Sequence, residues 1–189
     1  MAGRAGESRT VDDGTANSVS LLISILVRYP EIATVKFVPE GKVLKFTFMG
    51  SRPVSEDVWM AFQDGLRERV QAYAALVHGM SPTLQVERRD YAEVSLIEIS
   101  RDASTLTQEE ISLIIEYARA ELGSSLITED LAAEDAFDED LVFQDEMIEN
   151  MLEDLKETIQ HRNLIGFRED GRVLVFNKQN EKQSERTRT

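Results

Sequence analysis

The chain of 189 residues contains no cysteine and only two histidines. Without cysteine the protein cannot form a disulfide, a cysteine-ligated zinc site, an iron–sulfur cluster or a thiol nucleophile. Long apolar runs are also missing, because the longest, residues 21–27, contains Ser24 and is far shorter than the roughly 20 residues that cross a bilayer. The N-terminal residues lack the apolar core of a secretory signal. These absences predict a cytoplasmic protein without a membrane span.

Motifs that carry common chemistry are absent as well. The sequence has no glycine-rich phosphate loop and no Gly-x-Ser-x-Gly nucleophile elbow. A twelve-residue calcium loop starting at Asp138 would need glycine where Phe143 stands. His78 and His161 each fall near the end of a predicted helix, where the helix dipole favours a cation, so we interpret them as structural or surface residues. We predict no catalytic residues, no metal site and no cofactor.

The chain is rich in acid. It has 35 acidic and 21 basic residues, a net charge of −14. Residues 129–157 hold thirteen acids and one base, Lys156, which leaves 35 − 13 = 22 acids and 21 − 1 = 20 bases elsewhere. Such a negatively charged segment repels phosphates and attracts cations. Nucleic-acid affinity, in contrast, depends on positive side chains. The charge pattern argues against nucleic-acid binding by this segment and favours a basic protein surface as its partner.

The spacing of apolar residues predicts helices that alternate with hairpins. A helix capped by Asn17 or Ser18 ends at Pro30. The alternation over residues 32–48 then predicts a hairpin, with its turn at residues 39–42.

A long helix follows from Ser55 to Gly79. The β-rich stretch of residues 84–99 is too long for one strand, so we expect two strands that turn near residues 88–91. Gly65 inside the long helix marks either a close approach of another segment or a glycine that is merely tolerated.

The second half of the chain repeats this order. Thr107 and Glu110 have the spacing of a capping box at the start of a helix that Gly123 ends. After the acidic residues, a helix is predicted over residues 145–161 and a hairpin over residues 164–177.

The first and last hairpins resemble each other in sequence. This similarity indicates either a duplicated helix–hairpin unit or two hairpins that independently follow the same turn and alternation rules. The matching apolar residues are Val35, Phe37, Leu44 and Phe46 in the first and Ile165, Phe167, Leu174 and Phe176 in the last.

The predicted fold class is α+β: an antiparallel sheet built from three β-hairpins, each preceded by a helix, with the helices covering one face. We expect the C-terminal helix and hairpin either to complete the same sheet or to swap into a partner subunit. The expected organisation is a disordered tail (1–16), an α+β core domain (17–125), an acidic linker (126–144), a helix with the C-terminal hairpin (145–177) and a second disordered tail (178–189).

These observations favour a non-catalytic cytosolic interaction protein, an adaptor, chaperone or regulator, that docks a basic protein surface. A second copy of the chain is a further candidate partner. The residues predicted to bind the basic partner are Asp138, Glu139, Asp140, Asp145, Glu146, Glu149, Glu153, Asp154 and Glu157.

Two alternatives stay open at this point. The first is an RNA- or ribosome-associated factor that uses basic residues of the sheet, such as Lys36, Lys42 and Lys45, with the acidic segment acting as an intramolecular mimic of nucleic acid. The second is a metal-dependent enzyme based on carboxylates.

Overall fold

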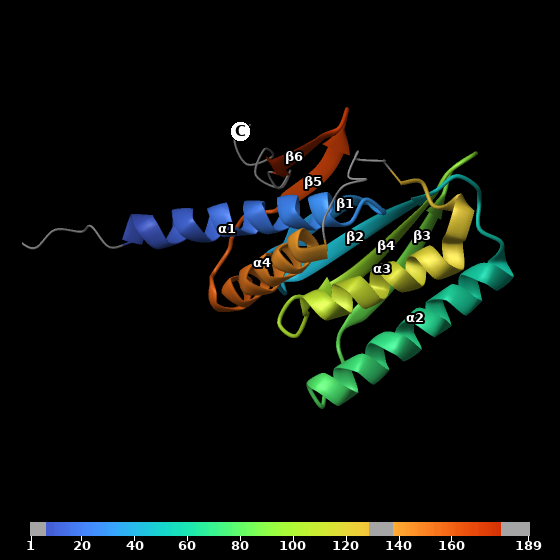
Figure 1. Ribbon diagram of the computed structural model, residues 1–189, viewed down its shortest axis with the longest axis horizontal. Coiled ribbons are helices and arrows are strands. Elements are labelled where there is room, and N and C mark those ends of the chain that lie inside the picture. Colours follow the sequence, from blue (N-terminus) through green and yellow to red (C-terminus); the bar gives the residue numbers. More distant parts are fainter. Residues whose placement is uncertain (1–6, 129–137, 179–189) are drawn as a thin grey trace, which may run out of the picture.

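The computed structural model describes residues 7–128 and 138–178. Its elements alternate as the sequence predicts, with helices between hairpins (Figure 1). In chain order they are α1 (Glu7–Arg28), β1 (Ile32–Val38), β2 (Val43–Gly50), α2 (Glu56–Val77), β3 (Leu84–Asp90), β4 (Ser95–Asp102), α3 (Gln108–Leu122), the short 3-10 helix η1 (Gly123–Ser125), α4 (Asp138–Glu157), β5 (Leu164–Glu169) and β6 (Arg172–Asn177).

The six strands form one antiparallel sheet in the order β3-β4-β2-β1-β5-β6. Three hairpins supply the strands, and the helices lie on one side of the sheet (Figure 1). The predicted α+β class and its hairpin construction are therefore confirmed. The last hairpin joins the sheet of its own chain, because β5 pairs with β1.

The core lies between the sheet and the helix layer. Val35 and Phe37 of β1, Phe46 of β2 and Ile97 and Ile99 of β4 are buried at alternate positions, so their side chains share the face covered by helices. The helices contribute the apolar stripes that the sequence shows. The buried helical residues include Leu22, Leu26, Phe62, Leu66, Ile111, Ile114, Leu152 and Leu155.

The last hairpin faces the other way from the first. Thr34 pairs with Phe167 and Phe37 pairs with Leu164, and residues opposite each other in a sheet share a face. Leu164 therefore lies on the helix side with Phe37. Ile165 and Phe167, the counterparts of Val35 and Phe37, lie on the uncovered side of the sheet.

Helix α1 explains this orientation. A Cβ added at Gly166 would lie 2.9 Å from Cδ1 of Leu26, so the helix side of β5 has no room for a larger residue there. Arg168, two positions on, donates to the carbonyl of Tyr29 at 2.8 Å and to the carbonyls of Leu26 and Ile32 near the end of α1. A cation at a helix C-terminus satisfies carbonyls that have no partner in the helix.

Two predicted helix starts and one turn are wrong in position. α1 begins at Glu7, inside the predicted tail of residues 1–16, and α4 begins at Asp138, inside the predicted linker of residues 126–144. The extension of α1 packs against the C-terminal end of α4, because the two helices lie side by side and a Cβ at Gly14 would lie 2.5 Å from Thr158. The turn between β3 and β4 lies at residues 91–94 rather than near 88–91.

Other parts of the predicted linker and tails fall outside the described residues, namely 1–6, 129–137 and 179–189. At the start of the predicted linker, Leu126 forms a β-bridge with Gly50, and the amide of Ile127 donates to the carbonyl of Met49 at 2.8 Å.

The predicted capping box at α3 is half right. The hydroxyl of Thr107 accepts from the amide of Glu110 at 3.2 Å, as expected for an N-cap. The carboxylate of Glu110 instead accepts two bonds, at 2.6 and 3.1 Å, from the fully buried guanidinium of Arg101. Burial raises the pKa of Glu110, although Arg101 opposes that effect.

Gly65 marks a close approach. A Cβ there would lie 2.1 Å from the Tyr117 hydroxyl, which donates to the carbonyl of Phe62 at 3.3 Å. This contact joins α2 to α3.

Candidate interaction surfaces

Helix α4 is held against the body of the protein by both apolar and polar contacts. Ile148, Leu152 and Leu155 are buried in the core. At the C-terminal end of the helix, the ammonium of Lys42 donates to the carbonyl of Lys156 at 2.6 Å. The acidic helix is therefore an integral part of the fold and presents a fixed surface.

Some predicted binding residues are used inside the molecule. Asp145 accepts from Nε of Arg28 at 2.9 Å, and Glu149 accepts from the backbone amide of Gln108 at 2.7 Å. Both contacts position α4 against α1 and α3. Their carboxylates are thus partly committed to the fold.

The other predicted acids point outward or make only surface contacts. Glu153 pairs with Lys156 of the same helix at 2.6 Å, and Asp154 accepts from the amide of Asn17 at 3.4 Å. Asp138 belongs to α4, but its side chain lies outside the described part of the structure. Four exposed acids have no hydrogen-bond or ion-pair partner among the described residues: Glu139, Asp140, Glu146 and Glu157.

Apolar side chains lie exposed among these acids. Phe143 is 61 % exposed, and Val142 and Met147 are also exposed. Phe143 and Met147 are four residues apart, so they form one row on the helix surface, next to Glu146. This row was not predicted, because residues 126–144 were expected to form a linker.

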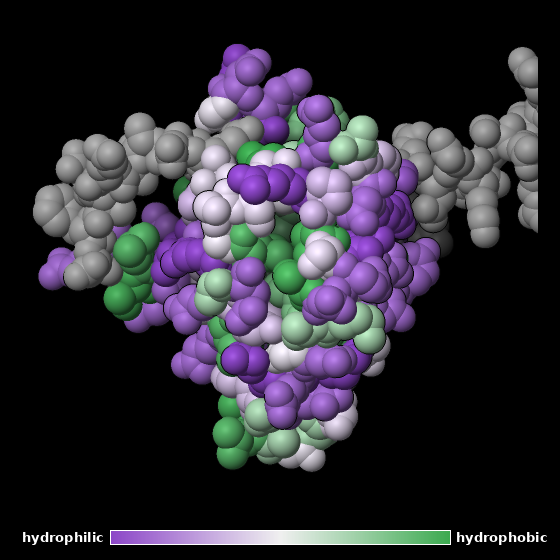
Figure 2. Space-filling model, turned by 90° about the vertical axis from the view of Figure 1, so that its right-hand side faces the viewer, coloured by the Kyte–Doolittle hydropathy of each residue, from purple (hydrophilic) through white to green (hydrophobic). Residues whose placement is uncertain are grey.

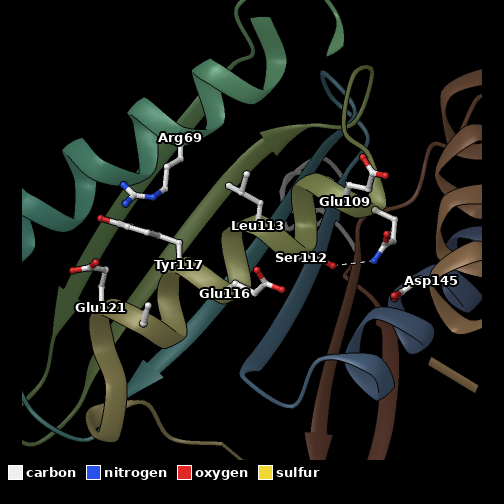
Figure 3. Close-up of a pocket in the computed structure, with 10 residues that line it drawn as sticks. Arg69, Glu109, Ser112, Leu113, Glu116, Tyr117, Glu121 and Asp145 are labelled. Atoms are coloured by element: carbon white, nitrogen blue, oxygen red, sulfur yellow. Dashed lines mark hydrogen bonds between the residues drawn. The ribbon is translucent and has the colours of Figure 1, made fainter. Parts of the chain in front are cut away.

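A hollow on the outer surface of α3 lies next to the exposed acids of α4. Its volume is about 590 Å³, and Glu109, Glu116 and Glu121 of α3 line it together with Asp145 of α4. Figure 3 shows Glu116 and Glu121 projecting from α3, with Asp145 across the hollow. We call this hollow and the exposed face of α4 the acidic surface.

Arg69 is the one basic residue in this lining. Its guanidinium lies 4.5 Å from the centre of the Tyr117 ring, and it donates to the carbonyl of Gly65 at 3.0 Å (Figure 3). Burial raises the pKa of Tyr117, and the nearby carboxylate of Glu121 raises it further. Arg69 thus belongs to the α2–α3 contact. Carboxylates still outnumber basic groups in the lining of the hollow.

A polar network fixes the other end of the hollow. The hydroxyl of Tyr29 lies 2.8 Å from that of Ser112, and the side-chain amide of Gln108 donates to the Tyr29 hydroxyl at 2.8 Å. Burial is the main reason that the pKa of Tyr29 is raised. These bonds tie the residue that follows α1 to α3, beside Asp145.

The uncovered face of the sheet has a different character. At its centre, Glu98 accepts from Lys36 at 2.9 Å and from Lys45 at 3.2 Å. Burial raises the pKa of Glu98, but the two lysines outweigh burial and bring this pKa below its ordinary value. Two of the three lysines considered for RNA binding, Lys36 and Lys45, are thus partly neutralised by their own chain, whereas Lys42 donates to the carbonyl of Lys156.

Two hollows of about 260 and 300 Å³ flank this cluster. Their apolar lining includes Met49, Leu96, Ile165 and Phe167. The side of the molecule in Figure 2 shows hydrophobic residues gathered in a hollow, with hydrophilic residues around it.

The described residues show neither a metal site nor a membrane span. None of their His, Asp and Glu side chains form a group of three or more that could hold a metal ion. No helix among them is long and apolar enough to span a bilayer. Comparisons of the chain with protein-family models, with curated proteins and with solved structures give no match.

The acids of α3 could have been found from the sequence. Ile111, Ile114 and Ile115 define the buried stripe of that helix, and Glu116 lies outside it. The packing of α3 beside α4 could not have been found, because it depends on contacts between distant segments.

Proposed function

We propose that this chain is a non-catalytic interaction protein of the cytoplasm, an adaptor, chaperone or regulator, that binds a basic amphipathic segment of another protein on its acidic surface. The observation that carries the proposal is the hollow on α3, whose lining combines four carboxylates with apolar residues that include Leu113 and Ala120. A lysine or arginine fits the carboxylates, and an apolar side chain fits the apolar part of the lining.

The exposed row of α4 supplies the apolar part of the contact. Phe143 and Met147 stand beside Glu139 and Glu146, an arrangement that suits a partner helix with apolar residues on one side and basic residues at its flanks. The carboxylates would speed association and select basic partners, and the apolar residues would supply much of the affinity.

A binding titration tests the proposal. The probe is a short synthetic helix-forming peptide of leucine and lysine, labelled for fluorescence anisotropy. The variant carries Glu116→Gln, Glu121→Gln and Glu146→Gln, three exposed residues without a hydrogen-bond partner among those the structure describes. We expect the affinity for the peptide to fall about tenfold, because each exposed ion pair contributes roughly 0.2–1 kcal/mol.

The matched control removes the same charge elsewhere. Glu40→Gln, Glu93→Gln and Glu169→Gln alter three exposed acids in or beside hairpin turns. This control should bind almost as tightly as the unaltered chain. Equal losses in the two variants would show only a net-charge effect and would contradict a specific site on α3 and α4.

A further inference from the structure

The two edge strands of the sheet are protected to different degrees. β3 carries Glu87, Arg88, Arg89 and Asp90, and charged side chains discourage another strand from pairing with an edge. β6 is apolar at four successive positions, residues 173–176, and Phe176 is 52 % exposed. In the described structure no strand pairs with the outer side of β6.

The backbone of β6 shows which groups point outward. The amide of Lys178 donates to the carbonyl of Asn163, and hydrogen-bonded pairs alternate along an antiparallel ladder. With the observed register, Leu174 and Phe176 bond to β5, so the backbone groups of Val173, Val175 and Asn177 point away from the sheet. A row of outward amides and carbonyls is a template for a further strand.

We propose that two copies of this chain join through β6, which pairs antiparallel with β6 of the second copy and makes one continuous sheet. Pairing centred on Val175 opposes it to the partner subunit's Val175, and Val173 to the partner subunit's Asn177. Leu174 then lies opposite the partner subunit's Phe176 on the uncovered face. The register is self-complementary, as a two-fold axis requires.

The charge distribution favours a second copy at this place. The whole chain carries a net charge of −14, yet residues 164–178 contain two acids and three bases. Copies that repel each other elsewhere can therefore approach along this hairpin. Phe176 already stacks on Phe167, with ring centroids 5.7 Å apart, so the uncovered face offers a preformed apolar cluster beside the edge.

The mass of the full chain in solution tests the proposal. Light scattering after size-exclusion chromatography should give twice the chain mass of 21.4 kDa. Val175→Pro removes an outward amide and keeps the bonds of β6 to β5, so this variant should have the mass of one chain. If that variant misfolds, Phe176→Lys provides the same test, because it places a charge in the contact. Phe143→Lys, which alters another exposed phenylalanine, on α4, should remain dimeric.

Disulfide trapping tests the register. The natural chain has no cysteine, so only the introduced cysteines can cross-link. Chains with Leu174→Cys mixed with chains with Phe176→Cys should cross-link under oxidation, whereas either alone should not. A single-chain mass for the unaltered protein overturns the proposal, even if deletion of residues 179–189 then allows dimers. Dimers that persist in both the Val175→Pro and Phe176→Lys variants also overturn it.

Discussion

The first and last hairpins carry the same apolar alternation and use it in opposite ways. In β1 and β2 the repeated residues face the helices, and Phe46 is 1 % exposed. In β5 and β6 the counterparts face away from the helices, and Phe176, the counterpart of Phe46, is 52 % exposed. Alternation therefore identifies a strand with one apolar face, while the register with its neighbour decides where that face points.

The largest expected effect separates the two hairpins directly. Phe46→Ala should lower the free energy of unfolding by about 3–5 kcal/mol, because it opens a cavity in the core. Phe176→Ala should cost only about 1 kcal/mol, the scale of one aromatic contact at the surface. Urea denaturation of dilute protein measures both values. Similar losses in the two variants would contradict the opposite orientation of the hairpins.

A second prediction concerns the helix side of the last hairpin. Gly166→Ala should destabilise the fold by about 1–3 kcal/mol, because the new methyl group would meet Leu26 of α1. Thermal unfolding followed by circular dichroism measures the loss. Restoring space with Leu26→Ala in the same chain should make the glycine substitution less harmful, and two additive losses would argue against this contact.

The smallest expected effect concerns Glu98, which lies on the uncovered face beside the first hairpin. Its pKa is lowered in the folded protein, so its ionised form stabilises the fold at neutral pH, and this stabilisation is lost as the pH falls below 4.5 through the lowered pKa. Glu98→Gln should reduce stability by about 1 kcal/mol at neutral pH. Urea titrations should show the difference shrinking in acid, and a constant difference would contradict the bonds to Lys36 and Lys45.

Much of the fold could be predicted because its signals are local. Alternation, turn residues and N-caps such as Ser55 and Thr107 identify hairpins and helix starts within a few residues. The extension of α1 could not be predicted, since it packs against the C-terminal end of α4, a segment far away in the sequence.

The candidate site was predicted only in part. The excess of acids in residues 129–157 is visible in the sequence, and exposed members such as Glu139 and Glu146 agree with an outward role. The contact of Asp145 with Arg28 and the hollow on α3 depend on tertiary structure. Composition therefore could not separate acids that bond within the fold from acids that are exposed to a partner.

The most direct test of the acidic surface is hydrogen–deuterium exchange of the full chain with and without the leucine–lysine peptide. Bound peptide should slow amide exchange in residues 109–121 and 139–157 and leave β3 and β4 unchanged. Protection confined to the uncovered face of the sheet, or no protection in α3 and α4 at saturating peptide, would contradict the proposed binding of basic segments by these two helices.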